Sequence, residues 1–208
     1  MIISALDDRA LLESVRVLRD GGIIVFPTET VYGVGALPFN KEAIERIYSV
    51  KNRNHSKALL LHISKVESLK LARDIPIEAF RLIDKFWPGP LSLILKASKE
   101  ISENSIGYGN TIGFRMPDDP FFRKLADMVG PIAATSANKS GNPSPVSVES
   151  AYEQLGNAVD LYVDGGKMRI GVASTILDLT RNQPTVLRVG AISISEIERV
   201  IGKVSLRT

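Results

Sequence analysis

Short apolar runs alternate with amphipathic segments along nearly the whole chain, and this alternation limits the folds that the chain can adopt. Residues 23–26 and 59–63 are apolar runs of strand length. Between them, Ile44, Ile47 and Tyr48 recur at helical spacing. Alternating strands and helices predict an α/β fold, in which helices cover the faces of a sheet.

The same periodicities predict the other elements. We expect helices near residues 11–18, 44–48, 77–86, 121–128, 148–155 and 193–201. We expect strands near residues 23–26, 59–63, 91–95, 111–115, 132–135, 161–163, 175–179 and 185–189. Ser193 and Glu196 have the spacing of a capping box. Because the strands after residue 158 follow one another closely, we expect a twisted mixed parallel/antiparallel sheet in a single domain over residues 1–208.

The composition excludes several kinds of chemistry. The chain has 208 residues, no cysteine, two histidines and a net charge of +3. Thiolate catalysis and cysteine-ligated metals are therefore excluded, and no spacing of other residues predicts a metal site made by protein side chains. No run approaches the ~20 apolar residues of a membrane span, and the N-terminus lacks a signal-peptide pattern. We expect a cytoplasmic protein without a membrane partner, and the basic excess permits a polyanionic one.

A polar segment at residues 27–33 follows the first predicted strand directly. Loops at strand ends are the usual ligand sites of open α/β sheets, so the hydroxyls of this segment, on Thr28, Thr30 and Tyr32, are candidates for lining a pocket for a small polar ligand. The same segment also suits an ordinary polar turn closed by Gly33 and Gly35. The residues alone do not decide between these two interpretations.

A basic segment follows the second predicted helix. Lys51, Arg53 and Lys57 fall within seven residues, just before a buried strand. Cations at this position often only complement the dipole of the helix C-terminus. They also suit a triphosphate, which arginine grips with a planar fork and lysine with a mobile point charge. No GxxxxGK[ST] motif occurs, so the segment is not a Walker loop.

Two further candidates lie on predicted strands. His62 is in an apolar run, where it is either a core residue or faces a site on the same side as Leu60. Thr111 and Arg115 share one face of the strand at residues 111–115. Arg115, at the strand end, is a candidate for pairing with a substrate carboxylate, although a surface salt bridge is an equally good explanation.

Residues 134–144 form the most unusual segment, since a strand runs into many small hydroxyl and amide side chains, among them Ser136 and Asn138. Such side chains offer many donors to anionic oxygens. Ser174 and Arg188 repeat this pattern beside later strands. Cations and hydroxyls without a nucleophile suit phosphoryl or nucleotidyl transfer, in which positioning and charge neutralisation supply most of the catalysis.

Several motifs together resemble one known family, the YrdC-type threonylcarbamoyl-AMP synthases. The resemblance covers roughly residues 11–201 and keeps the family's order. The motifs are FPTETVYG at 26–33, KxR at 51–53, PGP at 88–90, GFRMP at 113–117, SxN at 136–138, STI at 174–176 and VLR at 186–188.

This resemblance implies a nucleotidyltransferase that makes threonylcarbamoyl-AMP and pyrophosphate from L-threonine, bicarbonate or CO2, and ATP with Mg2+. The product serves N6-threonylcarbamoyladenosine modification of tRNA, so a separate transferase complex is an implied partner and weak tRNA binding is open. The family's fold has a concave basic cleft. Carried over by position, threonine would contact Thr30, His62, Arg115, Ser136 and Ser174. ATP would contact Lys51, Arg53, Lys57, Thr111, Asn138 and Arg188, and the catalytic set would be Lys51, Arg53, Ser136 and Asn138.

The chain departs from many relatives at residues 54–58, where it lacks two prolines, and this predicts a more mobile loop around Lys57. Its length matches the short, single-domain form of the family. The alternative is a non-catalytic RNA-binding protein of the same fold, as in the YciO-type relatives, which lack the intact KxR and SxN pair. A carbamoyltransferase of the hydrogenase-maturation type is a third possibility, but those proteins are much larger. Retention of KxR and SxN favours the synthase.

Overall fold

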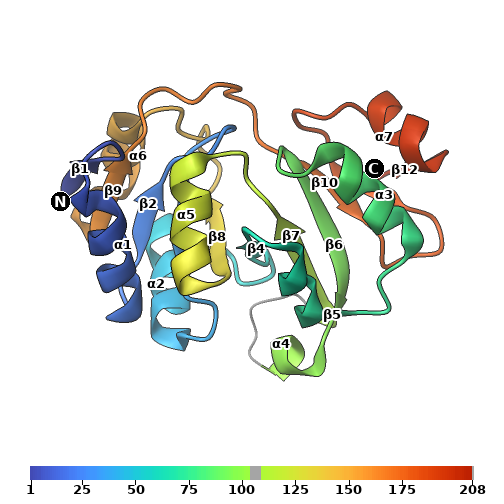
Figure 1. Ribbon diagram of the computed structural model, residues 1–208, viewed down its shortest axis with the longest axis horizontal. Helices are drawn as coiled ribbons and strands as arrows, with labels where there is room; N and C mark the ends of the chain where they lie inside the picture. Colours follow the sequence, from blue (N-terminus) through green and yellow to red (C-terminus); the bar gives the residue numbers. More distant parts are fainter. Residues whose placement is uncertain (104–108, 208) are drawn as a thin grey trace.

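The computed structural model describes residues 1–103 and 109–207, which form one twisted sheet with helices on both faces (Figure 1). The helices are α1 (Arg9–Arg19), α2 (Lys41–Lys51), α3 (Ile77–Phe86), α4 (Lys99–Glu103), α5 (Pro120–Val129), α6 (Val148–Leu155) and α7 (Ile194–Ile201), with 3-10 turns at Val66–Leu71 and Gly156–Ala158. The strands are β1 (Ile2–Ser4), β2 (Ile24–Phe26), β3 (Gly33–Ala36), β4 (Leu60–His62), β5 (Ala72–Arg73), β6 (Leu91–Ala97), β7 (Thr111–Arg115), β8 (Ile132–Ser136), β9 (Leu161–Asp164), β10 (Thr175–Asp178), β11 (Thr185–Arg188) and β12 (Ser205–Leu206). Each helix and strand expected from the sequence is present, so the predicted mixed α/β sheet is confirmed.

The strand order is β1-β9-β2-β3-β8-β4-β7-β6-β10-β11-β12, with β5 paired to β6. The antiparallel part expected from the closely spaced strands after residue 158 is present, although most of these strands pair in parallel. Of these, β9 is parallel to β1 and β2, β10 is parallel to β6, and β11 is parallel to β12. Only β10 and β11 pair antiparallel there, because each of the others reaches its neighbour through a crossover. Most antiparallel pairs lie instead among β2, β3, β8, β4, β6 and β7.

Strand β3 was not expected, because its sequence Gly-Val-Gly-Ala lacks the apolar run of a strand. Its two glycines allow close approach of its neighbours. A Cβ on Gly33 would lie 2.8 Å from the ring of Phe26, and one on Gly35 would lie 2.7 Å from Ile132. Glycine inside a strand marks such a close approach, and this signal was available in the sequence.

Apolar side chains fill both faces of the sheet. In β2, Ile24 and Phe26 belong to the core beneath α1 and α5, whereas Val25 belongs to the core on the other face. Figure 1 shows α1 and α5 near one end of the sheet, and α3 and α7 near the other. Burial on both faces explains why the strands are continuous apolar runs without alternation.

The helix ends follow local sequence signals. The capping box predicted for the last helix is confirmed, since Ser193 accepts from the Glu196 N–H and the Glu196 carboxylate accepts from the Ser193 N–H. Helix α2 begins at the cap Asn40 and ends at Asn52, whose φ of 48° is left-handed. That left-handed residue turns the chain so that Arg53 leaves the helix axis toward the sheet. Among residues 1–103 and 109–207, no helix has both the length and the apolar character needed to cross a membrane.

We predict that Ser193→Ala lowers the free energy of unfolding by about 1 kcal/mol, because one helix N–H loses its side-chain acceptor. Urea denaturation measures the change. Ser56→Ala, at an exposed position outside any helix, is the control and should leave the denaturation midpoint in place. Equal midpoints for the two variants would contradict the assigned role of the cap.

Candidate active site

A cavity of about 130 Å³ lies along strand β4, in the middle of the sheet. Ala58, Leu60 and His62 line it, and they are alternate residues on one face of the chain. The prediction that His62 shares a face with Leu60 is therefore confirmed, and that face opens to the cavity. The other polar lining residues come from separate segments: Thr28, Arg53, Arg115, Thr135, Ser136, Ser174 and Arg188.

Three arginines converge on this cavity from three different elements. Burial lowers the pKa of Arg53 and of Arg115. Desolvation at the cavity mouth, together with the charges of Arg115 and Arg53, lowers the pKa of Arg188, although the Arg188 side chain is still exposed at the rim. The charges of Arg115 and Arg53 that act on Arg188 indicate a region of positive potential, which favours an anionic ligand.

Hydrogen bonds fix the orientation of each arginine. Arg115 Nη2 donates to Thr30 Oγ1 at 2.8 Å and lies 2.8 Å from Glu29 Oε2. Arg188 donates from Nε and Nη2 to the Ser174 carbonyl, at 3.1 and 2.9 Å. With their side chains held in this way, the arginines can bind a ligand without a further loss of rotamer freedom.

Arg53 is held by the loop that it begins. Its Nε donates to the Lys57 carbonyl and its Nη2 to the Ala58 carbonyl, both at 2.9 Å. The Tyr48 hydroxyl donates to the same Lys57 carbonyl at 3.2 Å, and the His55 ring stacks on Tyr48 with centroids 4.4 Å apart. These contacts close the loop without the prolines of many relatives. The greater mobility expected for this loop stays a prediction.

Lys51 lies behind the cavity and does not line it. Its ammonium group is buried and donates to the carbonyl oxygens of Ser136 and Asn138. Burial and the charge of Arg53 lower the pKa of Lys51 to about 7, while the two carbonyl oxygens favour the protonated form. The contact joins the end of α2 to the loop after β8, so in this conformation Lys51 supports the loop and does not face a phosphate.

Comparisons with known proteins identify the family of this chain. Residues 16–190 match the family model for Sua5, YciO and YrdC proteins, which is described as "Telomere recombination". The chain belongs to this family.

Within the Sua5/YciO/YrdC family, a Pyrococcus abyssi protein named threonylcarbamoyl-AMP synthase is 42% identical over 91% of this chain and 56% of its own length. The structure of P. abyssi Sua5 complexed with L-threonine superimposes with a TM-score of 0.95 at 39% identity, over all of this chain and 62% of that one. Escherichia coli YciO superimposes with a TM-score of 0.83 at 29% identity, over 95% of this chain and 97% of that one. This chain therefore spans little more than half the length of the P. abyssi synthase.

Of the residues assigned by family resemblance, His62, Arg115, Ser136, Ser174, Arg53 and Arg188 meet at the cavity. Thr30 is completely buried and lies behind it, where its hydroxyl contacts Arg115 and Thr28. Asn138 is also buried, and its amide donates to the carbonyls of Lys139 and Asn142, both at 2.9 Å. Thr30 and Asn138 therefore lie next to the site but do not belong to the cavity lining.

Two predicted ATP ligands lie away from the cavity lining. Lys57 is exposed on its loop. Thr111 begins β7, whereas Arg115 ends it, so the two are about 13 Å apart along the strand. Their assignment as ATP ligands stays a prediction.

The site residues assigned from the sequence do not include Thr28, Thr135 and Glu29, although all three lie in polar segments that the sequence singled out. Thr28 lines the cavity and donates to the Val31 carbonyl at 2.7 Å, and Thr135 lines the cavity beside Ser136. Glu29 is buried against Arg115. A charged residue inside an otherwise apolar and hydroxyl-rich segment was the available signal, because a buried carboxylate needs a cationic partner.

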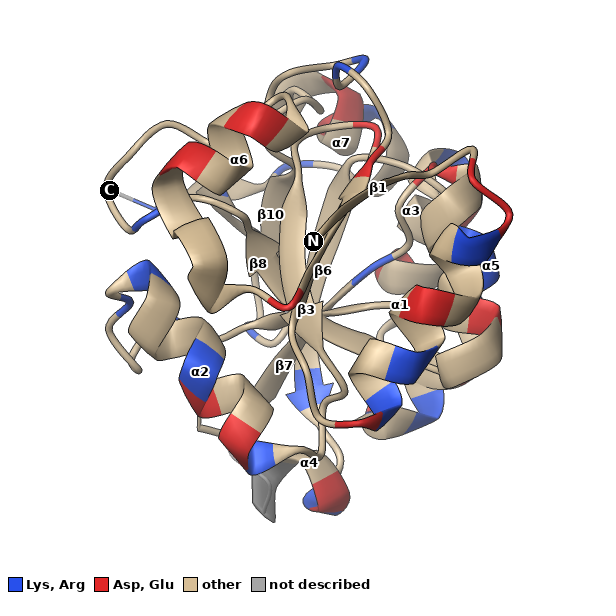
Figure 2. Cartoon of the chain, turned by 90° about the vertical axis from the view of Figure 1, so that its left-hand side faces the viewer, with Lys and Arg blue, Asp and Glu red and all other residues tan. Residues whose placement is uncertain are grey.

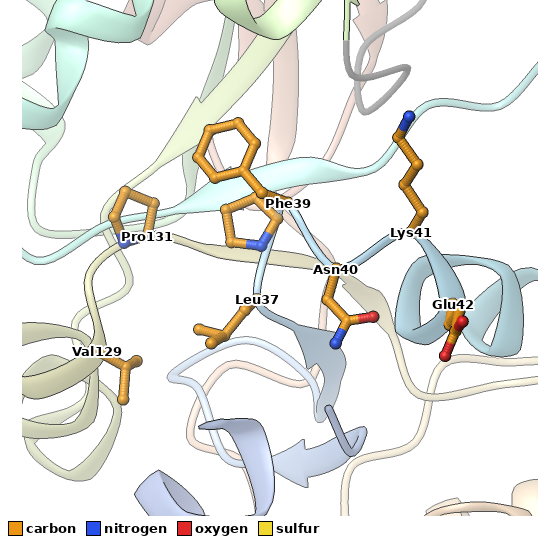
Figure 3. A pocket seen from close by; sticks show the side chains of 8 residues that line it. Leu37, Phe39, Asn40, Lys41, Glu42, Val129 and Pro131 are labelled. Atoms are coloured by element: carbon orange, nitrogen blue, oxygen red, sulfur yellow. The ribbon is translucent and has the colours of Figure 1, made fainter. Parts of the chain in front are cut away.

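Two larger hollows lack this convergence of cations. One, of about 650 Å³, lies between the start of α2 and the end of α5, and Figure 3 shows Leu37, Phe39, Val129 and Pro131 around it, with Lys41 and Glu42 at one end. The other, of about 730 Å³, is lined by carboxylates of residues 7, 8, 119 and 164, with Lys124. Within the described residues, His, Asp and Glu form no group of three or more that could hold a metal ion.

His62 is a buried, neutral imidazole at neutral pH. Burial first, and then the charge of Arg115, lowers its pKa well below 6.5. Its ring meets the rings of Phe26 and Phe122 edge-on, and its Nδ1 is buried without a hydrogen-bond partner among the described residues. A neutral ring offers one donor and one acceptor to a ligand.

We predict that acidification below pH 6.5 destabilises the protein through His62. The unfolded chain binds a proton on this residue below pH 6.5 and the folded chain does not, so the free energy of unfolding should fall by up to about 1.4 kcal/mol per pH unit. Denaturation of His62→Gln between pH 5 and 7 should lack this slope. The exposed His55→Gln variant is the control and should keep the wild-type change of the free energy of unfolding with pH. The same change in His62→Gln as in the wild type would contradict the prediction.

Proposed function

We propose that this chain is an L-threonylcarbamoyl-AMP synthase, a nucleotidyltransferase that joins L-threonine, bicarbonate or CO2, and ATP, and releases pyrophosphate. The observation that carries the proposal is the convergence of Arg53, Arg115 and Arg188 on one small cavity. The match to P. abyssi Sua5, whose structure contains L-threonine, supports threonine as the substrate.

The size of the cavity supports a division of the two ligands. At about 130 Å³ the cavity is well below the usual size of a nucleotide pocket. Threonine would occupy the cavity beside Arg115, His62, Ser136 and Ser174. The phosphates of ATP would lie over the rim, where Arg53 and the exposed Arg188 are available.

The chemistry follows from this arrangement. The amine of threonine attacks CO2, forming a C–N bond and losing a proton, and gives an N-carboxylate. An oxygen of this carboxylate attacks the α-phosphorus of ATP, the bond to the β-phosphate oxygen breaks, and pyrophosphate leaves. Arg53 and Arg188 would neutralise the charge that develops on the phosphates. The protein supplies position and positive charge, so no covalent enzyme intermediate is required.

Lys51, Ser136 and Asn138 would contribute to catalysis in different ways. Ser136 faces the cavity and can donate to a ligand oxygen. Its hydroxyl lies against the Asn138 side chain, and Lys51 holds both backbone carbonyls. We therefore assign Lys51 and Asn138 the role of fixing Ser136 relative to the substrate.

Mg2+ would enter with the nucleotide. The polar side chains of the cavity lining are guanidinium groups, hydroxyls and an imidazole, which do not form an oxygen-rich Mg2+ site. The phosphate oxygens of ATP would hold the ion, and Mg2+ would supply additional neutralisation of phosphate charge. Lys57 and Thr111 would contact the nucleotide only if it extended beyond the cavity.

The product would pass to a separate transferase that modifies tRNA. Figure 2 shows acidic and basic residues intermixed along α1 and α2, so these helices do not offer a uniformly basic surface, and direct RNA binding by this chain would be weak. The cytoplasmic location expected from the sequence stays a prediction.

A non-catalytic RNA-binding protein of the same fold is disfavoured. YciO has this fold, but the present chain keeps Lys51, Arg53, Ser136 and Asn138. Hydrogen bonds join Lys51, Ser136 and Asn138 to one another, and Arg53 lines the cavity. A cavity with these cations and hydrogen bonds in place is expected of an enzyme that binds a small anion.

The decisive experiment is release of pyrophosphate from ATP, measured with and without threonine and bicarbonate. We expect release that depends on both. Salt-sensitive binding of tRNA without threonine-dependent release would favour the RNA-binding alternative.

We predict that Arg53→Ala and Arg188→Ala each lower kcat/KM for pyrophosphate release by roughly 100-fold or more, because a charge that stabilises the transition state is lost. The exposed Lys41→Ala variant tests the effect of removing a cation elsewhere and should behave as the wild type. Near-normal activity of both arginine variants would refute the assigned phosphate site.

A further inference from the structure

A buried ion pair lies directly behind the cavity. Arg115 Nη2 lies 2.8 Å from Glu29 Oε2, and the two side chains are 5% and 2% exposed. The pair joins the last residue of β7 to the turn that follows β2. Burial of two charges is unfavourable unless the geometry is good and other hydrogen bonds satisfy the remaining donors and acceptors, so stability alone does not explain such a pair.

The hydrogen bonds of Arg115 determine what it can offer to a ligand. A guanidinium group has five N–H donors. Nη2 donates to Thr30 Oγ1 at 2.8 Å and forms an ion pair with Glu29 Oε2 at 2.8 Å, and Nε donates to the Gly89 carbonyl at 3.3 Å. Nη1 makes no hydrogen bond within the described part of the chain, and Arg115 lines the cavity. The two N–H groups of Nη1 are therefore the ones available to a ligand.

Glu29 is itself held in place from two sides. Its Oε2 also accepts from the Asp118 N–H at 3.1 Å, and its backbone carbonyl accepts from the Ile170 N–H at 2.9 Å. Its Oε1 is buried and has no partner among the described residues. Because Glu29 is anchored in this way, the guanidinium of Arg115 takes its orientation from the carboxylate.

We infer that Glu29 is a positioning residue for the substrate carboxylate: it fixes Arg115 so that only Nη1 faces the cavity. Glu29 does not line the cavity, so it acts through Arg115 and not by touching the ligand. The inference rests on the proposed function, because the carboxylate concerned is that of threonine.

Two effects of opposite sign follow from removing the charge of Glu29. The ligand carboxylate would no longer be repelled by Glu29, but Arg115 would lose its anionic anchor. Arg188, which lines the same cavity, repels Arg115. An unanchored guanidinium would turn away from Arg188 and from the ligand, so we expect the loss of orientation to dominate.

The first test compares Glu29→Gln with Glu42→Gln, a matched change at an exposed position on α2. Calorimetric titration with L-threonine should give a Kd that is roughly 10- to 100-fold higher for Glu29→Gln, the range expected when a charge-assisted hydrogen bond is lost. KM for threonine should rise by a similar factor, while kcat and the Kd of ATP stay within about threefold. Glu42→Gln should match the wild type.

The second test is a double-mutant cycle with Arg115→Met. If Glu29 acts through Arg115, the double variant should bind threonine as weakly as Arg115→Met alone. Its Tm should exceed that of Glu29→Gln, because no uncompensated buried charge remains. If Glu29→Gln does not fold, Glu29→Asp replaces it; the shorter carboxylate should displace the guanidinium and still weaken threonine binding.

The outcomes separate the inference from the proposed function. Unchanged threonine binding in Glu29→Gln, additive effects in the cycle, or equal losses of threonine and ATP binding would overturn the role of Glu29 while leaving the synthase proposal intact. A wild-type protein that neither binds threonine nor releases pyrophosphate would overturn the proposed function, and the inference with it.

Discussion

Cations are buried in the middle of a sheet whose two faces are otherwise apolar, and the rest of the site is built around the groups that compensate their charge. Lys51 is 1% exposed and Arg115 is 4% exposed. A buried charge without partners would cost several kcal/mol or more, so each must be compensated locally. Lys51 is compensated by two backbone carbonyls, and Arg115 by a carboxylate, a hydroxyl and a carbonyl. These partners come from loops that are distant in sequence, and the cations thereby join the loops into one site.

These cations give the cavity a positive electrostatic potential before any ligand enters. The hydrogen bonds of the cations leave particular donors free, and three guanidinium groups repel one another across a small volume. An anion relieves that repulsion, so binding energy is available without rearrangement of the side chains. The glycines of β3 leave room for the side chains of Phe26 and Ile132 to pack over this strand.

Much of the fold could be predicted from the sequence, because it depends on local periodicity. The positions of the long helices, the apolar strands and the capping box at Ser193 all follow from the spacing of apolar residues and from short-range polar pairs. Whether a given pair of strands runs parallel or antiparallel could not be predicted from the sequence, since this depends on which strands a crossover joins. Strand β3 was missed because its glycines lower its strand propensity, while tertiary packing against Phe26 requires them.

The sequence by itself determined the chemical character of the site: cations and small hydroxyls at the ends of elements, and family motifs in order. Only the tertiary structure decided which of these groups face the cavity. Lys51, Thr30 and Asn138 lie behind it, and Glu29, which lies in the FPTETVYG motif but received no role from the sequence, contacts the central arginine. The physical reason is that a side chain's exposure and its hydrogen-bond partners are set by contacts between segments far apart in the chain, and local sequence patterns do not encode these contacts.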